Sequence, residues 1–182
     1  MPAKAEAATD RYAAAKLVLS RIAHPVAIIA AAHGGERSCA TGTVMYVSLA
    51  PPMLAIAEHP GSRTARLIQG SREFSVSLLH DSQQDLAVAA GHSAEGPDKF
   101  VALKIPVAEQ PGFTAPAVEG SLAMIWCRVR EELPTGDHIL FVGEVVGAVT
   151  DERKVDALLR YRRRYLRLGH WTSGESPEGY PT

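Results

Sequence analysis

Short hydrophobic runs separated by polar and turn-forming residues dominate the chain, and many of these runs have the two-residue period of a β-strand. In one of them Phe74, Val76 and Leu78 alternate with serines, which predicts a half-buried strand. The same pattern, with its Val, Thr and Tyr enrichment, predicts strands over Val26–Ala31, Thr41–Leu49, Met53–Ala57, Glu73–Leu79, Ser121–Leu133 and His138–Thr150. Because Pro134-Thr135-Gly136-Asp137 is a strong turn sequence, we expect the last two strands to form a β-hairpin.

Helical periodicity is confined to short segments flanked by capping residues, Gly or Pro. The predicted helices are Asp10 to about Ala23 with Asp10 as N-cap, Ser62–Gln69 with Ser62 as N-cap and Gly70 as stop, a segment capped by Asp81 or Ser82 and ending at Ala90, and Lys154–Leu159. Many short strands with few helices are typical of an antiparallel barrel or sandwich rather than of alternating βα units.

Composition narrows the class of protein. The chain has 182 residues, 19 Lys plus Arg against 20 Asp plus Glu, and a net charge of -1, which argues against a nucleic-acid binder. Its two cysteines, Cys39 and Cys127, are too far apart for a C-x-x-C zinc motif and fit a reducing cytoplasm. The longest apolar stretch, Pro25–Ala32, is far shorter than a bilayer span. We therefore expect a cytoplasmic protein without a membrane or nucleic-acid partner.

The length and the absence of a linker predict one domain, over residues 10–170. Residues 1–9 are alanine-rich and mixed in charge, and residues 171–182 are polar and rich in Gly and Pro. We expect both ends to be flexible.

Familiar catalytic motifs are missing from the sequence. There is no Walker P-loop, no G-x-G-x-x-G and no H-E-x-x-H, and the seven histidines are scattered, so no metal site is predicted. The segment Gly91–Gly96 is a near miss of the G-x-S-x-G elbow, but it lies in a predicted loop rather than between a strand and a helix.

Three segments carry candidate chemistry. Thr41-Gly42-Thr43, leading to Ser48, could place a flat ligand against the backbone, although Thr is equally common in ordinary strands. Glu58-His59-Pro60-Gly61-Ser62-Arg63-Thr64 places a glycine, two hydroxyls and a guanidinium at a predicted helix start, which suits an anion; simple capping explains the same residues equally well. The third candidate is His138, beside the hairpin turn, where an ordinary turn residue is the alternative.

Taken in order, several motifs resemble the flavin reductase-like family, with its FMN-binding split barrel. The resemblance covers roughly residues 12–169. The motifs that carry it are His24-Pro25-Val26-Ala27-Ile28-Ile29, Thr41-Gly42-Thr43, Val47-Ser48-Leu49-Ala50-Pro51-Pro52-Met53-Leu54, Ser62-Arg63-Thr64, Phe74–Leu79, Asp98-Lys99-Phe100, Gly136-Asp137-His138 and Tyr161-Arg162-Arg163-Arg164-Tyr165.

This resemblance implies a mainly β, antiparallel Greek-key split barrel with a few short peripheral helices, and a homodimer with flavin near its interface. It implies a flavin reductase that transfers hydride from NAD(P)H to FMN or FAD, with a separate monooxygenase component as a partner that would receive reduced flavin. The resemblance places Thr41, Gly42, Thr43 and Val44 along the flavin ring, Ser62, Arg63 and Thr64 at the phosphate, and His138 with Tyr165 or Arg164 on the nicotinamide side. The other implied cofactor-binding residues are Ser48, Glu58, His59, Lys99 and Phe100. His138 is the implied catalytic residue, in a positioning role.

The chain also departs from the family pattern. Gly42 stands where the family often has Asn, and Met45-Tyr46 replaces a small Thr-Ser pair, which we expect to narrow the flavin pocket. Two other functions stay open on the same fold: a flavoprotein that keeps its FMN and passes electrons on, and a flavin-binding module without turnover.

Overall fold

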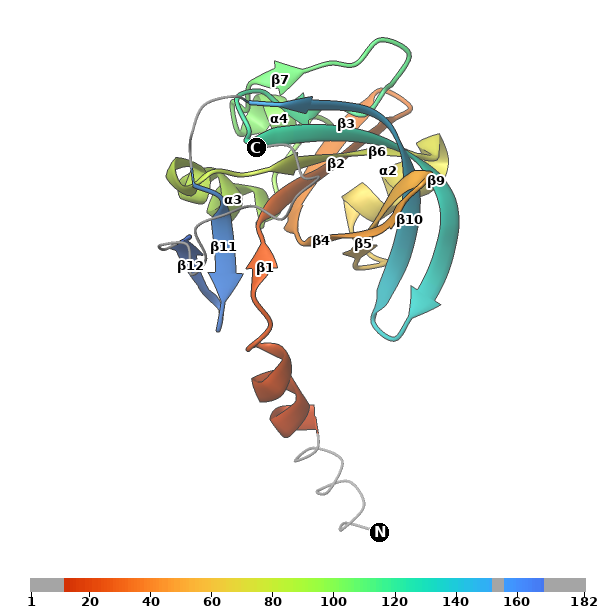
Figure 1. Ribbon diagram of the computed structural model, residues 1–182. Coiled ribbons are helices and arrows are strands. Elements are labelled where there is room, and N and C mark those ends of the chain that lie inside the picture. Colours follow the sequence, from red (N-terminus) through yellow and green to blue (C-terminus); the bar gives the residue numbers. More distant parts are fainter. Residues whose placement is uncertain (1–11, 152–155, 169–182) are drawn as a thin grey trace.

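The computed structural model describes residues 12–151 and 156–168 (Figure 1). Within these ranges the chain is mostly antiparallel β-structure with a few short helices, which confirms the predicted fold class. The predicted cap Asp10, the terminal segments 1–9 and 171–182, and the start of the segment Lys154–Leu159 lie outside the described residues.

A seven-stranded antiparallel sheet forms the body of the molecule. In spatial order its strands are β3 (Glu36–Gly42), β2 (Ala27–His33), β6 (Glu73–Leu78), β9 (Ala123–Thr135), β10 (His138–Thr150), β5 (Pro52–Glu58) and β4 (Val44–Leu49). Three pairs, β2–β3, β4–β5 and β9–β10, are sequence neighbours joined as hairpins.

The chain itself brings the two edges of this sheet together. Edge strand β3 ends at Gly42 and the opposite edge strand β4 begins at Val44, so only Thr43 separates them. The sheet therefore curls into a barrel whose two edges meet at a corner without a continuous hydrogen-bonded ladder. The single strand predicted over Thr41–Leu49 is wrong for this reason: the chain changes from one edge to the other at Thr43.

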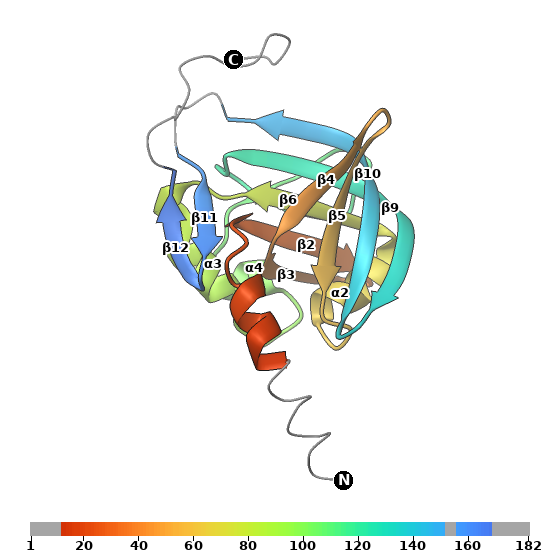
Figure 2. The same cartoon turned by 60° about the horizontal axis from the view of Figure 1, so that its bottom comes forward.

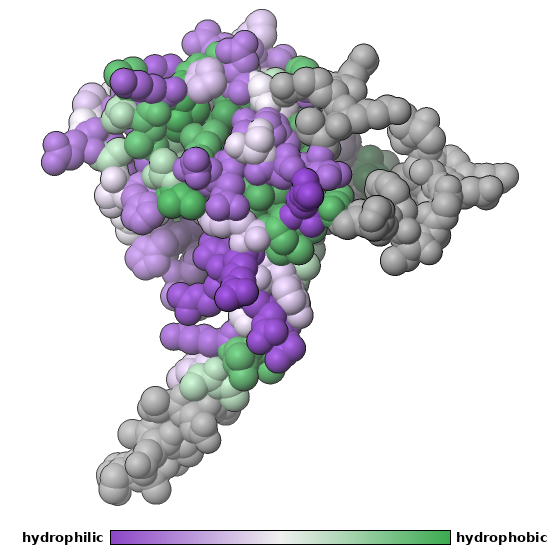
Figure 3. Space-filling model, turned by 90° about the vertical axis from the view of Figure 1, so that its left-hand side faces the viewer, coloured by the Kyte–Doolittle hydropathy of each residue, from purple (hydrophilic) through white to green (hydrophobic). Residues whose placement is uncertain are grey.

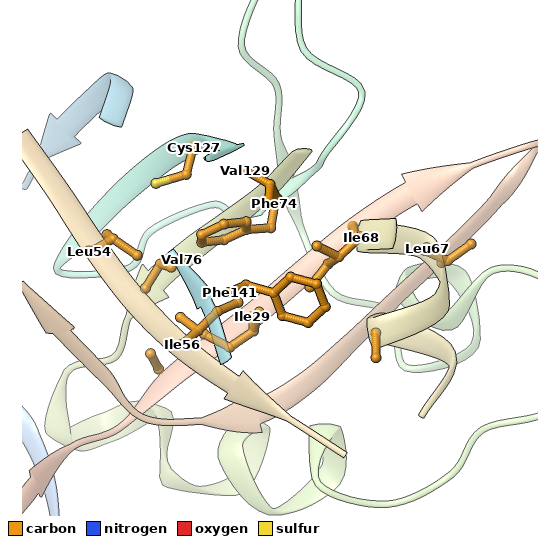
Figure 4. Close-up of a cluster of buried hydrophobic side chains, with 13 residues drawn as sticks. Ile29, Leu54, Ile56, Leu67, Ile68, Phe74, Val76, Cys127, Val129 and Phe141 are labelled. Carbon is orange, nitrogen blue, oxygen red and sulfur yellow. The ribbon is translucent and has the colours of Figure 1, made fainter. Parts of the chain in front are cut away.

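The barrel interior holds the first hydrophobic cluster (Figure 4). Ile29, Ile56, Phe74 and Phe141 lie in it, from four different strands. The opposite face of β2 carries Ile28 into a second buried cluster beneath the peripheral helices. Because β2 is covered on both faces, its sequence is continuously apolar rather than alternating.

Strand β6 confirms the strand predicted over Glu73–Leu79, but it is covered on both faces, so the predicted half-burial is wrong. Ser75 and Ser77, expected to face solvent, are completely buried. Their hydroxyls take part in hydrogen bonds with the loop that carries β7 (Val107–Ala108) and β8 (Ala117–Val118): Ser75 Oγ donates to the Pro116 carbonyl and Ser77 Oγ accepts from the Val118 N–H. Hydrogen bonding makes serine acceptable at positions that alternation alone assigns to solvent.

One barrel position requires glycine for close packing. A Cβ built on Gly143 of β10 would lie 2.5 Å from Phe74 Cζ and 2.8 Å from Cys127 Cβ. The glycine thus makes room for the Phe74 ring in the barrel core.

Helix α2 (Arg63–Ser71) closes one end of the barrel and contacts β2 and β3. It begins at the predicted cap Ser62, but it ends at Arg72, in the left-handed region at φ 59°, instead of at Gly70. Gly70 serves a different need, because a Cβ there would lie 2.5 Å from the His33 ring.

The remaining helices are short. They are residues 12–19, η1 (Asp81–Gln83), α3 (Gln84–Ala90) and α4 (Lys99–Ala102). Asp81 and Ser82 lie inside the 3₁₀ turn η1, which His80 caps, so neither of them begins the α-helix as predicted. No helix in the described ranges is long and apolar enough to cross a membrane.

The predicted hairpin is confirmed, but its turn is shorter than expected. Pro134 and Thr135 pair with Ile139 and His138, so the turn is only Gly136-Asp137, with Gly136 at φ 63°. A smaller sheet of β1 (His24–Pro25), β11 (Leu158–Tyr161) and β12 (Arg164–Arg167) lies beside the barrel (Figure 2). Leu158 and Leu159, predicted to be helical, are strand residues there because β11 pairs with β1 and β12.

Candidate functional site

A cavity of about 240 Å³ lies where the start of α2, the middle of β3 and the segment after α3 meet. The residues that line it are Ser38, Cys39, Ala40, Gly61, Ser62, Arg63, Thr64, Ala90, Gly91, His92, Ser93, Ala94 and Lys99. None of these carries a carboxylate, whereas Arg63 and Lys99 are cationic. The cavity therefore suits an anion.

Local sequence explains why a helix starts at this cavity. Ser62 has extended backbone angles, and its hydroxyl accepts a hydrogen bond from the Ala65 N–H at 3.0 Å. The N–H groups of the first helical turn have no acceptor within the helix itself, and the helix dipole adds positive potential there. Thr64 is buried, and its hydroxyl lies 3.2 Å from that of Ser38 on β3.

Arg63 fastens the loop that forms one wall of the cavity. Its guanidinium donates to the carbonyls of Gly96 at 2.5 Å and Ala94 at 3.5 Å. The sequence predicts that Arg63 binds an anion. In the structure Arg63 lines the cavity, and its guanidinium also holds the loop 91–97 in place.

Lys99 is the buried cation of the site, with only 6% of its surface exposed. Its ammonium group donates to the carbonyls of Cys39 at 2.8 Å and Ala90 at 2.7 Å, which ties β3 to the end of α3. Burial lowers the pKa of Lys99. The adjacent Asp98 caps α4 through the Phe100 and Val101 N–H groups and forms an ion pair with Arg37.

Glu58 lies just behind the helix start and is 5% exposed. The Ser62 hydroxyl donates to its Oε2 at 3.3 Å. Burial raises the pKa of Glu58 to about 7, although the Ser62 hydrogen bond and the nearby His138 act in the opposite direction. Near neutral pH this carboxyl is thus partly protonated, and it repels a neighbouring anion less than an ordinary glutamate would.

His138 belongs to a separate polar group at the tip of the β9–β10 hairpin. Its Nδ1 lies 2.8 Å from Asp137 Oδ1, and the hydrogen bond from His138 lowers the pKa of Asp137. The His59 ring lies edge-on to the His138 ring, with 6.2 Å between their centroids. His59 also accepts a hydrogen bond from the Gly61 N–H at 3.1 Å, so this group adjoins the segment that leads into α2.

The predicted flavin-ring residues form the corner between β3 and β4, outside the cavity lining. The Thr41 hydroxyl donates to the Ala87 carbonyl at 2.5 Å and so fastens β3 to α3. A Cβ on Gly42 would lie 3.1 Å from Ile29, so the backbone approaches the core closely there. Thr43 is exposed, and Val44 and Ser48 are half-buried.

The other predicted residues are placed elsewhere. Phe100 is buried in the second hydrophobic cluster. Arg164 and Tyr165 lie on β12 of the small sheet. Met45 and Tyr46, expected to narrow the flavin pocket, are exposed side chains of edge strand β4 and do not line the cavity.

Sequence reasoning missed two walls of the cavity. Ser38, Cys39 and Ala40 come from a strand without a motif, and only the pairing of β3 with β2 brings them to α2. Gly91–Ala94 belongs to the near miss of the hydrolase elbow, and the Gly and polar residues of this loop are the signal in the sequence that points to it.

Comparison with known proteins identifies the family of the chain. A family model described as "Flavin reductase like domain" matches residues 19–169. The chain is similar to the reductase component of 4-hydroxyphenylacetate 3-monooxygenase from Thermus thermophilus, with 32% identity over 154 residues, covering 84% of this chain and 94% of the relative. It is also similar to the NADH:riboflavin 5'-phosphate oxidoreductase of Streptomyces pristinaespiralis, with 28% identity over 149 residues and 81% and 82% coverage.

Solved structures give the same result. Nitrilotriacetate monooxygenase component B from Mycobacterium thermoresistibile superimposes with a TM-score of 0.81 and 30% identity, over 96% of both chains.

Proposed function

The chain belongs to the flavin reductase-like family, and on that premise we propose that it transfers hydride from NAD(P)H to FMN or FAD. The observation that carries the proposal is the cavity at the start of α2, which is lined by hydroxyls and two cations and by no carboxylate. We assign to it the phosphate end of the flavin, held by Ser62, Arg63 and Thr64 and by the first-turn N–H groups.

The size of the cavity supports placing only the phosphate end of the flavin inside it. About 240 Å³ is below the roughly 300–1,000 Å³ typical of sites that bury a whole drug-sized ligand. The cavity therefore takes only the phosphate end, and the ring lies beyond it. We assign the ring to the β3–β4 corner, where Thr41, Gly42, Thr43 and Val44 offer backbone groups and small side chains.

Bound flavin supplies the hydride acceptor of this reaction, so the protein needs no strong acid or base for that step. The residues of the chain bind and orient the flavin and the nicotinamide donor, and they exclude water from the reacting atoms. We assign His138, held by Asp137, to positioning the nicotinamide. Lys99 stabilises the cavity walls and contributes positive charge.

A second copy of the chain completes the site in this proposal. Edge strand β4 exposes Met45, Tyr46, Val47 and Leu49, each with 44–73% of its surface accessible. An apolar, unpaired edge strand next to the ring position favours burial against another chain. We therefore propose a homodimer through this face, and sedimentation of the wild type against Tyr46→Lys tests it. A monomeric wild type contradicts it.

We propose in addition that reduced flavin serves a separate monooxygenase component, because relatives are named as reductase components of such systems. Both cysteines of the chain are free and buried, which supports a cytoplasmic location.

The experiment that tests the activity is oxidation of NADH and of NADPH with FMN, FAD and riboflavin in parallel. Repeated turnover that depends on added free flavin is expected. Turnover limited to protein-bound flavin indicates instead the flavoprotein that keeps its FMN, and flavin binding without oxidation of either donor contradicts the proposed function.

Two sets of variants test the residue assignments. Arg63→Ala with Thr64→Ala is expected to weaken FMN binding by about 1–3 kcal/mol through loss of charge-assisted hydrogen bonds. Riboflavin, which lacks the phosphate, should lose little affinity. His138→Ala is expected to slow flavin reduction in stopped flow while leaving FMN affinity almost unchanged, and an unchanged reduction rate removes that role.

A further inference from the structure

The small sheet beside the barrel presents an arginine-rich hairpin outward. We call residues 158–167, formed by β11, the turn Arg162-Arg163 and β12, the arginine hairpin. Tyr161 pairs with Arg164 and Leu159 with Leu166, so these four side chains share one face of the hairpin. Leu158 and Tyr165 lie on the other face and pack into the second hydrophobic cluster. The first face is therefore directed away from the core.

A cavity of about 540 Å³ adjoins this outward face, and Figure 3 views this side of the molecule. It is lined by Tyr161, Arg162, Arg164, Tyr165 and Leu166, and it shares no residue with the cavity at α2. Its volume lies within the range of small-ligand sites. The Tyr161 ring and the guanidinium groups of Arg162 and Arg164 are suited to a ligand that combines a flat ring with anionic charge, whereas Tyr165 packs towards the core.

The arginines of the hairpin differ from those of the barrel in their partners. Arg37, Arg66, Arg72, Arg128 and Arg130 each lie within 4.0 Å of a carboxylate. In the described part of the chain, no carboxylate pairs with Arg160, Arg162, Arg163 or Arg164, which are all exposed. Arg160 instead lies over the Tyr165 ring, and only Arg167 approaches an acid, Asp81 at 3.9 Å. This positive charge is available to a ligand.

The turn holds its arginines in an unfavourable backbone conformation. Arg162 has φ 51° and Arg163 has φ 65°, and a two-residue hairpin turn with both angles positive strongly prefers Asn-Gly. Side chains with a Cβ are disfavoured there. Residues held in such a conformation are found preferentially at functional sites, so the turn and the cavity point to the same use of these arginines.

We propose that the arginine hairpin binds the phosphate groups of an adenine nucleotide, with Tyr161 against the base. The inference rests on the proposed function, in which two ligands contain an adenine nucleotide: the dinucleotide hydride donor and FAD, through its adenylate half. A concave site of this size favours a nucleotide over a protein surface, and the net charge of -1 gives no extended basic track for nucleic acid.

Binding of ADP and of adenosine, followed by calorimetry, tests the proposal directly. ADP carries the diphosphate common to both ligands, whereas adenosine carries none. ADP is expected to bind at least tenfold more tightly than adenosine, and Arg162→Gln with Arg164→Gln is expected to remove most of that difference. The matched control Arg130→Gln changes an arginine already paired with Glu144 on the barrel and should leave ADP affinity unchanged.

Steady-state kinetics then distinguish whether the hairpin binds the hydride donor or FAD. If the donor binds here, the glutamine variants raise KM for NADH or NADPH about tenfold with FMN as acceptor, and kcat changes little. If FAD binds here, KM rises for FAD and not for FMN. Unchanged KM values for both, together with unchanged ADP affinity, overturn the proposal.

The turn provides a variant whose stability and affinity should move in opposite directions. Arg162→Asn with Arg163→Gly installs the preferred turn residues, so the melting temperature should rise while ADP affinity falls at least severalfold. A purely structural hairpin would gain stability without losing affinity, and that result contradicts the proposal. A wild type that oxidises neither NADH nor NADPH refutes the proposed function alone, because the ADP titration still tests the hairpin.

Discussion

Glu58→Gln tests the electrostatics of the cavity by removing one buried ionisable group. Burial raises the pKa of Glu58 from its ordinary value of 4.5 to about 7. Between these values the folded protein holds a proton that the unfolded chain releases, so the free energy of unfolding falls as pH rises through this window. At 1.36 kcal/mol per pKa unit, the full cost above pH 7 is about 3 kcal/mol.

The substitution should remove most of this pH dependence. Glutamine is neutral at every pH and keeps an oxygen that can accept the Ser62 hydroxyl. Relative to wild type, Glu58→Gln should therefore gain about 2.5 kcal/mol of stability between pH 5 and pH 8, since about 1 kcal/mol of the cost is already present at pH 5.

The assay is urea unfolding followed by circular dichroism at several pH values, at one fixed protein concentration because the proposed dimer makes stability concentration-dependent. Glu131→Gln is the matched control, because Glu131 is exposed on the β9–β10 hairpin. A difference between Glu58→Gln and wild type that stays constant from pH 5 to pH 8 would refute the reasoning.

Two further substitutions test the packing around the site. Lys99→Met leaves the buried carbonyls of Cys39 and Ala90 without their donor, so we expect a loss of about 2–4 kcal/mol in unfolding free energy and weaker FMN binding, with exposed Lys104→Met as control. An equal loss in both lysine variants would contradict this role. Gly143→Ala drives a Cβ against Phe74 and Cys127 and should cost about 1–3 kcal/mol in thermal or urea unfolding, whereas Gly147→Ala on the same strand meets only the end of the Gln110 side chain and should cost less.

Local chemistry made several elements predictable. Ser62 has the hydroxyl that caps α2, and Gly136-Asp137 has the conformational freedom that a two-residue hairpin turn needs. The hydroxyls and the guanidinium of Ser62, Arg63 and Thr64 indicated an anion, and they do line the cavity. These features depend on residues within a few positions of one another, so a sequence pattern contains them.

Other predictions failed where a distant segment decided the outcome. Ser75 and Ser77 look solvent-facing until the loop 115–118 covers them and supplies hydrogen-bond partners. Leu158 and Leu159 look helical until β1 offers them an edge to pair with. In each case a tertiary contact outweighed a weak local preference.

The sequence by itself determined the β-rich class, the position of the hairpin and the segment that we propose binds an anion, because each depends on alternation, turn chemistry or capping over a short stretch. Only the tertiary structure decided that β3 and β4 form opposite edges meeting at Thr43, and that Ser38, Lys99 and Gly91–Ala94 complete the cavity. The tertiary structure also gave Glu58 its raised pKa and left Arg160, Arg162, Arg163 and Arg164 without carboxylate partners in the described chain. Burial and the partners of a charge depend on which segments pack together, and residues far apart in sequence settle that.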